Sequence, residues 1–497
     1  MILRSLSSPC GSGSVFASPW YRTLTCAALT GASLLTLCGC GPRRMRADFH
    51  GFELAYAETS NHEVLLNLAR LRRREPTYFF KMGQITSSYR MQASLTGTGN
   101  YTPQGTVPGG AIPTGGGTPS VLVENDPVFQ FIPVNDETSA ELLFKPIQAE
   151  TFYILYQQGW RADQLFRLMV DRIELTHQTP RGCEVQVIRN VPPVTYSGTL
   201  SDYDKQANEL TSYATFLRVS ALVYALQKHG LLLLTGEEKF VPFDKDSVLD
   251  KGTAPSATNF NDAASKGTIW KHDASGAWVL GSKVFSAKFE LNPHLEVAGE
   301  NGVKAYVPDQ KAIQAIIEDD FPELKRGPAL RTSLAIMAAG FSIEGAPNAQ
   351  QPTENPCAEA SSHLVLRSML GIMAAAAQEQ SSFDALTHLD PVIPLDRHIP
   401  ESLQESSRPH FSNAVPQIER LPLLRMTWGN EHQPSDSVIT VSYRGTEYKI
   451  ADEKDNSEPE NEAWNRDMFR LIGQLTSQVT VDISKFPLPQ ILQLHSQ

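Results

Sequence analysis

The sequence predicts an α+β fold of several modules, with largely antiparallel strands and helices set apart from them. Apolar residues recur with the helical period over some stretches and alternate with polar residues over others. Several strand-like runs follow one another across turn residues, which is typical of hairpins. At 497 residues the chain is too long for one ordinary core, so we expect more than one domain.

The composition is that of a globular, acidic protein. Hydrophobic residues make up 41% of the chain and charged residues 20%, and the formal net charge is −11. Arg4 and Arg22 are the only charged residues before position 40, so the remainder carries −13. Such a chain lacks the basic stripe that gains free energy from releasing phosphate counterions, and we expect no nucleic-acid partner.

Residues 1–39 have the features of a lipoprotein signal peptide. Arg22 precedes the apolar run 24–38, which has the length of a signal-peptide core and is too short to span a bilayer. The run ends in Leu37-Cys38-Gly39-Cys40, with an apolar residue three places before the last cysteine and a small one directly before it. We expect cleavage before Cys40 and acylation of its thiol. A secretory signal that happens to contain cysteines, or a short core segment, is the alternative.

The residue after Cys40 favours the outer membrane. It is Gly41, whereas Asp at this place is the usual signal for retention at the inner membrane. Several acyl chains on one cysteine give stable anchoring, because each buried methylene adds about 0.8 kcal/mol. We therefore expect the protein to be held at the periplasmic face of the outer membrane through Cys40.

Two further cysteines remain after cleavage, Cys183 and Cys357. The periplasm is oxidising, so a disulfide between them is permitted. Two buried thiols are the alternative interpretation.

Residues 40–56 are expected to form a tether, followed over 57–135 by a helix and a long hairpin. The helix is predicted over Asn61–Arg74, with Ser60 and Glu63 as its capping box. The arginines at its end, Arg70 and Arg72 to Arg74, suit a helix C-terminus and would also suit lipid headgroups or peptidoglycan carboxylates.

The hairpin is predicted from two strand-like runs, 78–95 and 121–134. Between them, Gly97–Pro119 is rich in Gly, Thr and Pro, cannot bury a core, and is expected to be mobile.

The remaining modules are assigned by periodicity. Residues 136–230 form a helical module, with helices at Ala149–Gln158, Arg161–Leu175 and Asp204–His229 and a strand at Cys183–Arg189. Residues 231–345 are predicted to form mainly strands and to end in the apolar helix Leu330–Ala339. Residues 346–420 are predicted to contain the helix Leu366–Ala375 and a Pro-rich linker. Residues 421–497 are predicted as a hairpin with its turn at Arg444-Gly445, the helix Trp464–Thr476 and the closing strand Val479–Ile483.

Five groups of segments are distinctive together: Asn61–Leu71 with Pro76 and Ile85; Leu142–Ile147; Gln157–Trp160 with Leu168 and Ile173; Leu366–Leu370; and Pro422–Arg425 with Val441–Gly445 and Phe469. They resemble an uncharacterised family of bacterial outer-membrane lipoproteins of about this length. The resemblance implies lipidation and the general architecture, and it supplies no activity and no catalytic residue. The chain departs from the pattern near Tyr448–Glu453, where the family tends to have an aromatic residue followed by paired acids, whereas here Glu447 and Lys449 flank a lone Tyr448.

No motif indicates catalysis, so the catalytic residues are unknown. The spacings of zinc ligands, of a serine-hydrolase elbow and of a phosphate-binding loop are all missing from the sequence. The acid–histidine cluster of His388, Asp390, Asp396 and His398 lies in Pro-rich loop sequence, where solvated surface groups are the ordinary interpretation. We expect no metal and no cofactor.

The main hypothesis is a membrane-anchored, non-catalytic structural or interaction component of a cell-envelope assembly, which binds other proteins or its own copies. One alternative is an envelope hydrolase acting on glycans, whose carboxylates would leave no local signature. Another is an oligomeric outer-membrane pore to which each copy contributes the hairpin, since membrane-spanning strands need about 9–11 alternating residues. Pro127 and Pro133 in the returning strand favour a soluble sheet edge instead.

Overall fold

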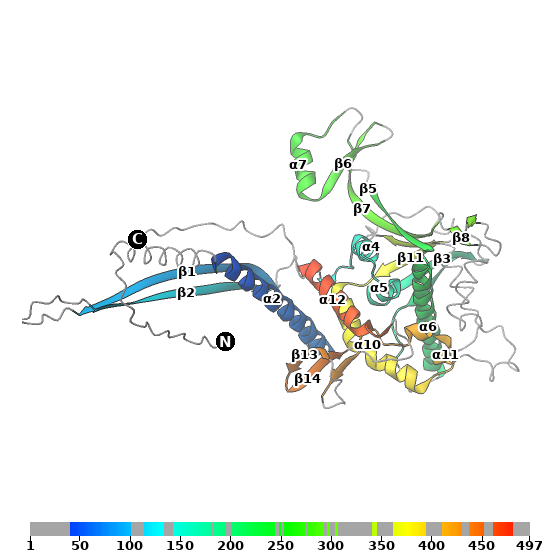
Figure 1. Cartoon of the computed structure of the whole chain (residues 1–497). Coiled ribbons are helices and arrows are strands. Elements are labelled where there is room, and N and C mark those ends of the chain that lie inside the picture. The colour runs from blue at the N-terminus through cyan, green and yellow to red at the C-terminus, as the bar shows by residue number, and fades with distance from the viewer. Residues whose placement is uncertain are drawn as a thin grey trace, which may run out of the picture. The chain divides into compact units, whose positions relative to one another are not determined.

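The computed structural model has an α+β fold (Figure 1). It describes residues 40–100, 114–133, 143–179, 182–194, 200–243, 248–249, 253–273, 276–292, 296–298, 304–306, 340–344, 361–393, 410–429, 437–451 and 461–480. The chain divides into two compact units, residues 1–62 and 63–497. Of the first unit, only residues 40–62 are described.

Helix α2 (Cys40–Arg72) replaces the tether expected over residues 40–56. The segment 41–57 has no β-branched residue and is rich in Ala and Arg, and Pro42 falls in the first turn, where its missing N–H breaks no helical bond. The expected capping box is therefore wrong, since Ser60 lies inside the helix. Glu63 Oε1 instead accepts the backbone N–H of Phe80 at 2.7 Å.

Strands β1 (Phe80–Asn100) and β2 (Thr114–Pro133) form the long hairpin. Their antiparallel register runs from Phe80 opposite Pro133 to Asn100 opposite Thr114, with one irregularity between Met82 and Ile85. Ten of the 23 residues expected to be mobile are paired instead, because residues 97–100 continue β1 and 114–119 continue β2, while 101–113 lie outside the described residues. Ladder hydrogen bonds join backbone groups, so a Gly-rich sequence can extend a ladder without burying a core.

The main described sheet has seven strands in the order β4-β3-β11-β10-β7-β5, with β6 also paired to β7. The strands are β3 (Val170–Thr179), β4 (Gly182–Arg189), β5 (Leu232–Pro242), β6 (Thr268–His272), β7 (Trp278–Leu291), β10 (Phe341–Glu344) and β11 (Ser361–Leu366). Only β10 and β11 pair in parallel within this sheet. The expectation of largely antiparallel strands is confirmed for the described residues.

Helices α4 (Ala149–Gln157), α5 (Ala162–Met169) and α6 (Leu200–Lys228) come from the predicted helical module. The helix expected over Arg161–Leu175 is wrong in its second half, because the chain becomes β3 at Val170. Asn190 explains the break: its Nδ2 donates to the carbonyls of Arg167 at 2.8 Å and Val170 at 2.7 Å, which caps the last turn.

The core lies between these helices and the sheet. Four buried aromatic rings meet there edge-on or tilted, with centroid distances of 5.7–6.2 Å: Phe152, Phe166, Phe289 and Phe341. Such edge contacts add to the free energy of area burial. Helix α10 (Met369–Leu389) completes this layer with buried Met369, Ile372 and Met373.

The C-terminal module contains a described sheet of three strands in the order β12-β14-β13: β12 (Met426–Trp428), β13 (Ser437–Tyr443) and β14 (Thr446–Ala451). The predicted turn is confirmed. Arg444 and Gly445 both have positive φ, 50° and 76°, as a two-residue hairpin of the favoured twist requires. Helix α12 (Trp464–Thr480) follows, so the closing strand expected from Val479 is wrong for its first two residues.

Other described elements are short: α7 (Ala257–Ser265), β8 (Glu296–Ala298), β9 (Lys304–Tyr306), α11 (Phe411–Ala414) and the 3₁₀ helix η4 (Gln417–Glu419). The residues predicted as a signal peptide, those predicted as the helix Leu330–Ala339 and most of the predicted Pro-rich linker lie outside the described residues. None of the described helices is long and apolar enough to cross a membrane.

Candidate functional site

The predicted lipidation residue, Cys40, is the first residue of α2. The signal peptide before it lies outside the described residues, so cleavage and acylation remain predictions. An anchor at this place would pass directly into a helix.

Cys183 forms a disulfide. Cys357 lies outside the described residues, so the pairing of these two cysteines remains a prediction, although the sheet register supports it. Ser361, which begins β11, pairs with Thr176 of β3, and Thr176 pairs with Val185 of β4. The strand that follows Cys357 thus begins at the end of the sheet where Cys183 lies.

The base of the hairpin is fixed by polar contacts to α2. Asn67, which is fully buried, donates from Nδ2 to the carbonyl of Tyr78 at 2.7 Å and accepts the N–H of Tyr78 at 3.0 Å. Glu63 adds the bond to Phe80 N–H, and burial raises the pKa of Glu63 above its ordinary value. Tyr78, which precedes β1, and Phe80, the first residue of β1, are therefore both held on the helix.

The register sorts the hairpin residues into two sides that differ in polarity. From Ile85 onward, odd-numbered positions of β1 face odd-numbered positions of β2, so they belong to one side of the ribbon. The opposed pairs on that side include Ile85–Phe129, Met91–Val123, Ala93–Val121 and Leu95–Pro119. The other side includes Ser88–Asp126, Arg90–Glu124, Ser94–Ser120 and Thr96–Thr118. The hairpin is an amphipathic ribbon by sequence.

Charge is confined to the half of the ribbon nearest its base. The last charged pair is Arg90 opposite Glu124. Beyond it, Met91–Asn100 and Thr114–Val123 contain no charged residue. Among the described residues, β1 and β2 pair only with each other, so the outer edge of each strand is unpaired there.

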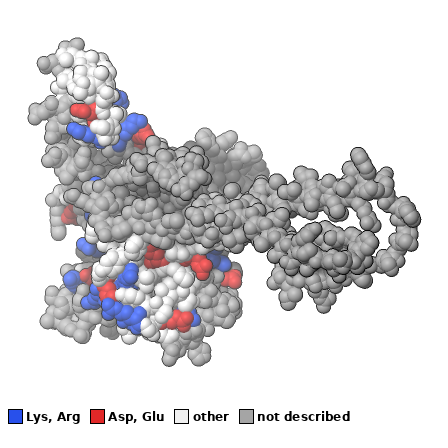
Figure 2. Space-filling model, turned by 90° about the vertical axis from the view of Figure 1, so that its left-hand side faces the viewer, with Lys and Arg blue, Asp and Glu red and all other residues white. Residues whose placement is uncertain are grey.

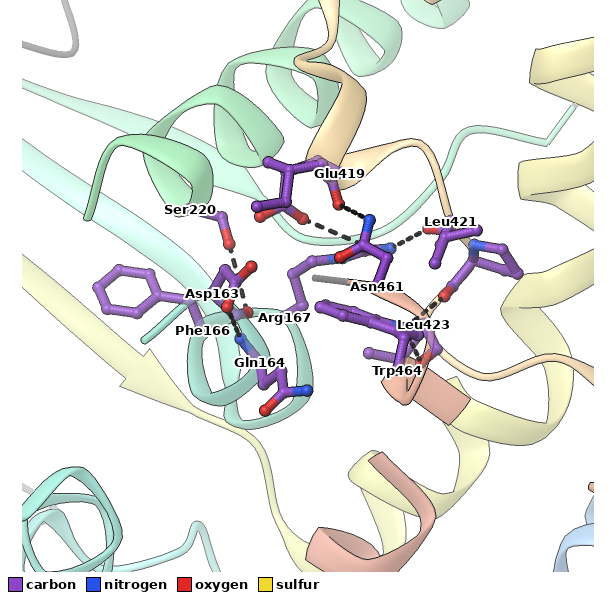
Figure 3. Close-up of polar contacts among 12 residues, drawn as sticks. Asp163, Gln164, Phe166, Arg167, Ser220, Glu419, Leu421, Leu423, Asn461 and Trp464 are labelled. Carbon is purple, nitrogen blue, oxygen red and sulfur yellow. Dashed lines mark hydrogen bonds and ion pairs between the residues drawn. The ribbon is translucent and has the colours of Figure 1, made fainter. Parts of the chain in front are cut away.

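The main body holds a buried ionic cluster (Figure 3). Arg167 Nη1 contacts Glu419 Oε2 at 3.0 Å, and Arg167 Nη2 donates to the carbonyl of Leu421 at 2.6 Å. The Arg167 side chain is 1% exposed and that of Glu419 is fully buried. These contacts fix the segment after η4 on α5. Burial raises the pKa of Glu419 to about 8 against the opposing charge of Arg167.

A second ion pair extends this cluster. Arg161 contacts the fully buried Asp163 through two bonds, of 3.0 and 2.5 Å, and its Nη1 donates to Asn461 Oδ1 at 3.3 Å. Burial works to lower the pKa of Arg161, but the charge of Asp163 and its hydrogen bonds hold that pKa above the ordinary value. The indole of Trp464 lies against both guanidinium groups, at 5.2 Å from Arg161 and 5.0 Å from Arg167.

Arg367 forms a separate buried centre. Its Nη2 donates to the carbonyl of Asn190 and to Glu379 Oε1, the latter at 3.1 Å, and its backbone joins Met169 and Ile147. Burial raises the pKa of Glu379, while Arg367 lowers it. These contacts tie β11, β4, α5 and α10 together.

The arginines at the end of α2 have partners inside the fold. Arg72 lies 3.5 Å from the centre of the Trp428 ring and donates to the carbonyl of Ala377. Arg73 Nε donates to Tyr448 Oη at 2.8 Å. Tyr448 thus holds the residue that directly follows α2. On the face drawn in Figure 2, basic and acidic residues of the described part are interspersed.

These clusters link segments of the fold that are far apart in the sequence. Each buried carboxylate just named contacts an arginine of the same fold. Within the described residues, no group of histidine, cysteine and acidic side chains could hold a metal ion. Of the acid–histidine cluster, Asp390 accepts Ser412 N–H and Oγ–H and lies 3.5 Å from His410, whereas Asp396 and His398 lie outside the described residues.

Sequence reasoning missed Arg167, Glu419, Arg367 and Asn67. A weak signal existed for Arg167, which follows Leu165 and Phe166 and precedes Leu168 and Met169. A charged residue among such neighbours indicates a buried partner. The partner, Glu419, is 252 positions away and could not be identified.

No protein-family model matches the chain, and the comparisons with curated proteins and with solved structures find no match either.

Proposed function

We propose that the chain is a lipoprotein, acylated on Cys40 and held at the periplasmic face of the outer membrane, where it serves as a non-catalytic structural or interaction component of an envelope assembly. The signal sequence and Gly41 support the anchor and its address. The hairpin β1–β2 is the observation that carries the interaction function.

A two-stranded ribbon is only marginally stable by itself in water. Here the strands have 21 and 20 residues, well beyond the 5–6 that are common, yet they pair only with each other among the described residues. Natural proteins protect unpaired edges with charges, prolines and bulges. From Ile85 to Asn100, β1 has one charge and no proline. This edge is suited to pairing with a strand of a second copy or of another envelope protein.

The ribbon also favours a second candidate function, insertion of its distal half into the membrane as part of an oligomeric pore. The uncharged stretches Met91–Asn100 and Thr114–Val123 match the length that a strand needs to cross a bilayer. Their odd-numbered side is apolar and their even-numbered side is mostly polar. Pro119 opposes this candidate, because it falls within the distal stretch.

The anchor is tested by Cys40→Ser. We expect this variant to remain unprocessed or to leave the membrane fraction, since the thioether needs a free thiol. Metabolic labelling with a fatty-acid analogue should label the wild type and miss the variant. An unlabelled wild type would refute the lipoprotein assignment.

The interaction function is tested by deleting residues 97–119. Ser94 and Ser120 face each other directly, so the deletion leaves them joined by Leu95-Thr96 as a short hairpin. We expect the detergent-solubilised variant to melt like the parent but to lose oligomer mass or a co-purifying partner, measured by native mass spectrometry. If the variant keeps the oligomer mass and the co-purifying partners of the parent, residues 97–119 are dispensable for assembly and the proposal is refuted.

A further inference from the structure

The end of α2 and the turn of the hairpin β13–β14 form one basic patch. Arg73 donates from Nε to Tyr448 Oη at 2.8 Å and from Nη2 to Thr446 Oγ1 at 2.9 Å, which joins the two segments. Arg444 Nη2 lies 3.2 Å from Glu75 Oε2. Four positive side chains and one negative give the patch a charge of +3, although the chain as a whole carries −11. The charged members of this patch are Arg70, Arg73, Arg74, Arg444 and Glu75.

Two of these arginines have a backbone conformation that favours other residues. Arg74, the second residue after α2, has a φ of 59°, and Arg444, the first residue of the hairpin turn, has a φ of 50°. Glycine and asparagine are usual at both kinds of position, because a longer side chain is strained at positive φ. Strain at two neighbouring, exposed arginines points to a function of their side chains.

The same two arginines have N–H donors available to a ligand. A guanidinium has five such donors. Arg74 is exposed and, unlike Arg73, makes no side-chain hydrogen bond or ion pair with the described residues. Arg444 is 62% exposed, and of its nitrogens only Nη2 contacts a carboxylate. An aromatic surface borders the patch, since Arg70 lies 5.1 Å from the ring of Tyr78, which is 54% exposed.

The chemistry of the patch fits a carboxylate on a polymer. A guanidinium binds a carboxylate through two parallel N–H···O bonds, and a phosphate offers the same oxygens. A bilayer is an extended anionic plane, and the acidic chain as a whole would be repelled by it. A polymer that carries separate carboxylates can contact the patch alone.

We propose that Arg74 and Arg444 bind the carboxylates of peptidoglycan peptides, with Arg70 and Tyr78 at the border of the same surface. This inference rests on the proposed function, because the periplasmic address brings the chain to the cell wall. It adds a partner of stated chemistry to the one that the hairpin β1–β2 would bind.

The arginines are tested by Arg74→Asn and Arg444→Asn. The mature-length chain with Cys40→Ser, which carries no acyl chains, is sedimented with purified peptidoglycan sacculi. We expect each substitution to weaken binding roughly tenfold, while the melting temperature stays equal or rises because asparagine relieves the strain. Arg189→Asn removes one charge from an exposed arginine of β4 and should leave binding unchanged. Variants that melt lower than the parent and bind sacculi equally well would show that the arginines stabilise the fold, and the proposal would be wrong.

Two further measurements identify the ligand. We expect sacculi whose carboxylates have been amidated to lose the binding that Arg74 and Arg444 provide. Vesicles of equal parts phosphatidylglycerol and phosphatidylcholine should not distinguish the Asn variants from the parent. Variants that lose vesicle binding and keep sacculus binding would make lipid phosphate the ligand and overturn the proposal.

The failure of this inference can be told apart from that of the proposed function. If cell fractionation finds the native chain outside the envelope, the proposed function fails, whatever the purified chain binds. If the native chain lies in the envelope and both Asn variants bind sacculi like the parent, only the carboxylate site fails.

Discussion

The side chain of Asn67 makes two hydrogen bonds with the backbone of Tyr78, accepting its N–H at 3.0 Å and donating to its carbonyl at 2.7 Å. An amide is the side chain that can donate and accept in this paired way. Asn67 therefore holds Tyr78 on α2, beside the bond from Phe80 N–H to Glu63, and the direction in which β1 leaves the helix depends on these contacts.

Asn67→Ala should destabilise the base of the hairpin. The substitution removes two hydrogen bonds to the backbone of Tyr78, an exposed residue, and an ordinary hydrogen bond contributes about 0.5–1.5 kcal/mol net. We expect hydrogen exchange at residues 78–82 to accelerate and the free energy of unfolding to fall by about 1–3 kcal/mol. Thr59→Ala, which removes an exposed bond to the carbonyl of Ala55, is the control and should change little. Unchanged exchange at Tyr78 would show that Asn67 does not hold the hairpin.

Local chemistry explains what was predictable in the fold. The turn at Arg444-Gly445 was predicted because two residues with positive φ suffice to reverse a strand, and nothing distant is needed. The end of α5 was not predictable. The cap at Val170 comes from Asn190, twenty positions later, whose Nδ2 reaches it only once β3 and β4 have paired. The apolar period of Leu165, Leu168 and Ile173 fits a helix that continues, so the sequence alone favoured the wrong element.

The same contrast holds for the candidate site. Cys40 and the amphipathic hairpin were predictable, since a lipobox and alternation are read from adjacent residues. The contacts that hold the body together were not. Arg367 joins Asn190 to Glu379 across 177 and 12 positions, and only folding brings these groups together.

Glu419 should give the stability of the protein a distinctive pH dependence. Burial raises its pKa in the fold from the ordinary value of 4.5 to about 8. Between these values the native state keeps a proton that the unfolded chain has released. The free energy of unfolding therefore falls as the pH rises from about 4.5 to about 8, by up to about 1.4 kcal/mol per pH unit from this group, and is flat above.

Glu419→Gln removes that titration, so we expect its stability to change less over this window than that of the wild type. Denaturant titrations at pH 5, 6.5 and 8 measure the difference. Asp390→Asn is the matched control, because Ser412 bonds and nearby positive charge outweigh desolvation and hold the pKa of Asp390 below its ordinary value. The stability contributed by Asp390 is lost only as the pH falls through that lowered range. If Glu419→Gln and wild type have parallel slopes, the pKa of Glu419 is not raised in the fold.

The disulfide of Cys183 is predicted to have Cys357 as its other half. Ser361 follows Cys357 by four residue steps, which can span at most about 13–14 Å. Strands β4 and β11 lie two strand spacings, about 10 Å, apart, so the reach is sufficient. Non-reducing electrophoresis of the unreduced protein should show faster migration, lost in Cys183→Ser and in Cys357→Ser alike. A bridge closing so long a loop stabilises by about 3–5 kcal/mol in the chain-entropy model. Alkylation of Cys357 in the unreduced protein would refute the pairing.

The last prediction distinguishes strand pairing from membrane insertion as the function of the uncharged half of the hairpin, Met91–Asn100 with Thr114–Val123. Leu95 and Thr96 are adjacent in β1 and belong to opposite sides, opposed by Pro119 and Thr118. If the ribbon acts by pairing its β1 edge in water, a lysine at either position weakens assembly similarly, because edge charges block pairing on both sides. If the ribbon inserts into a bilayer, Leu95→Lys costs about 2–4 kcal/mol on the lipid side, whereas Thr96→Lys on the polar side is tolerated.

We expect both lysine variants to lower the oligomer mass of the solubilised protein to a similar extent, while both melt like the parent. Leu233→Lys on β5, an outer strand of the main described sheet where Leu233 is 39% exposed, controls for a lysine on a strand edge and should leave the mass unchanged. Protease digestion of intact membranes supplies the second readout. Edge pairing in water leaves the chain near Arg90 and Glu124 open to cleavage, whereas insertion protects residues 91–123. If only Leu95→Lys loses assembly and residues 91–123 are protected, the pore replaces the interaction function. A lipid environment penalises a lysine on the apolar side of the strand and tolerates one on the polar side, so it distinguishes these two neighbouring positions.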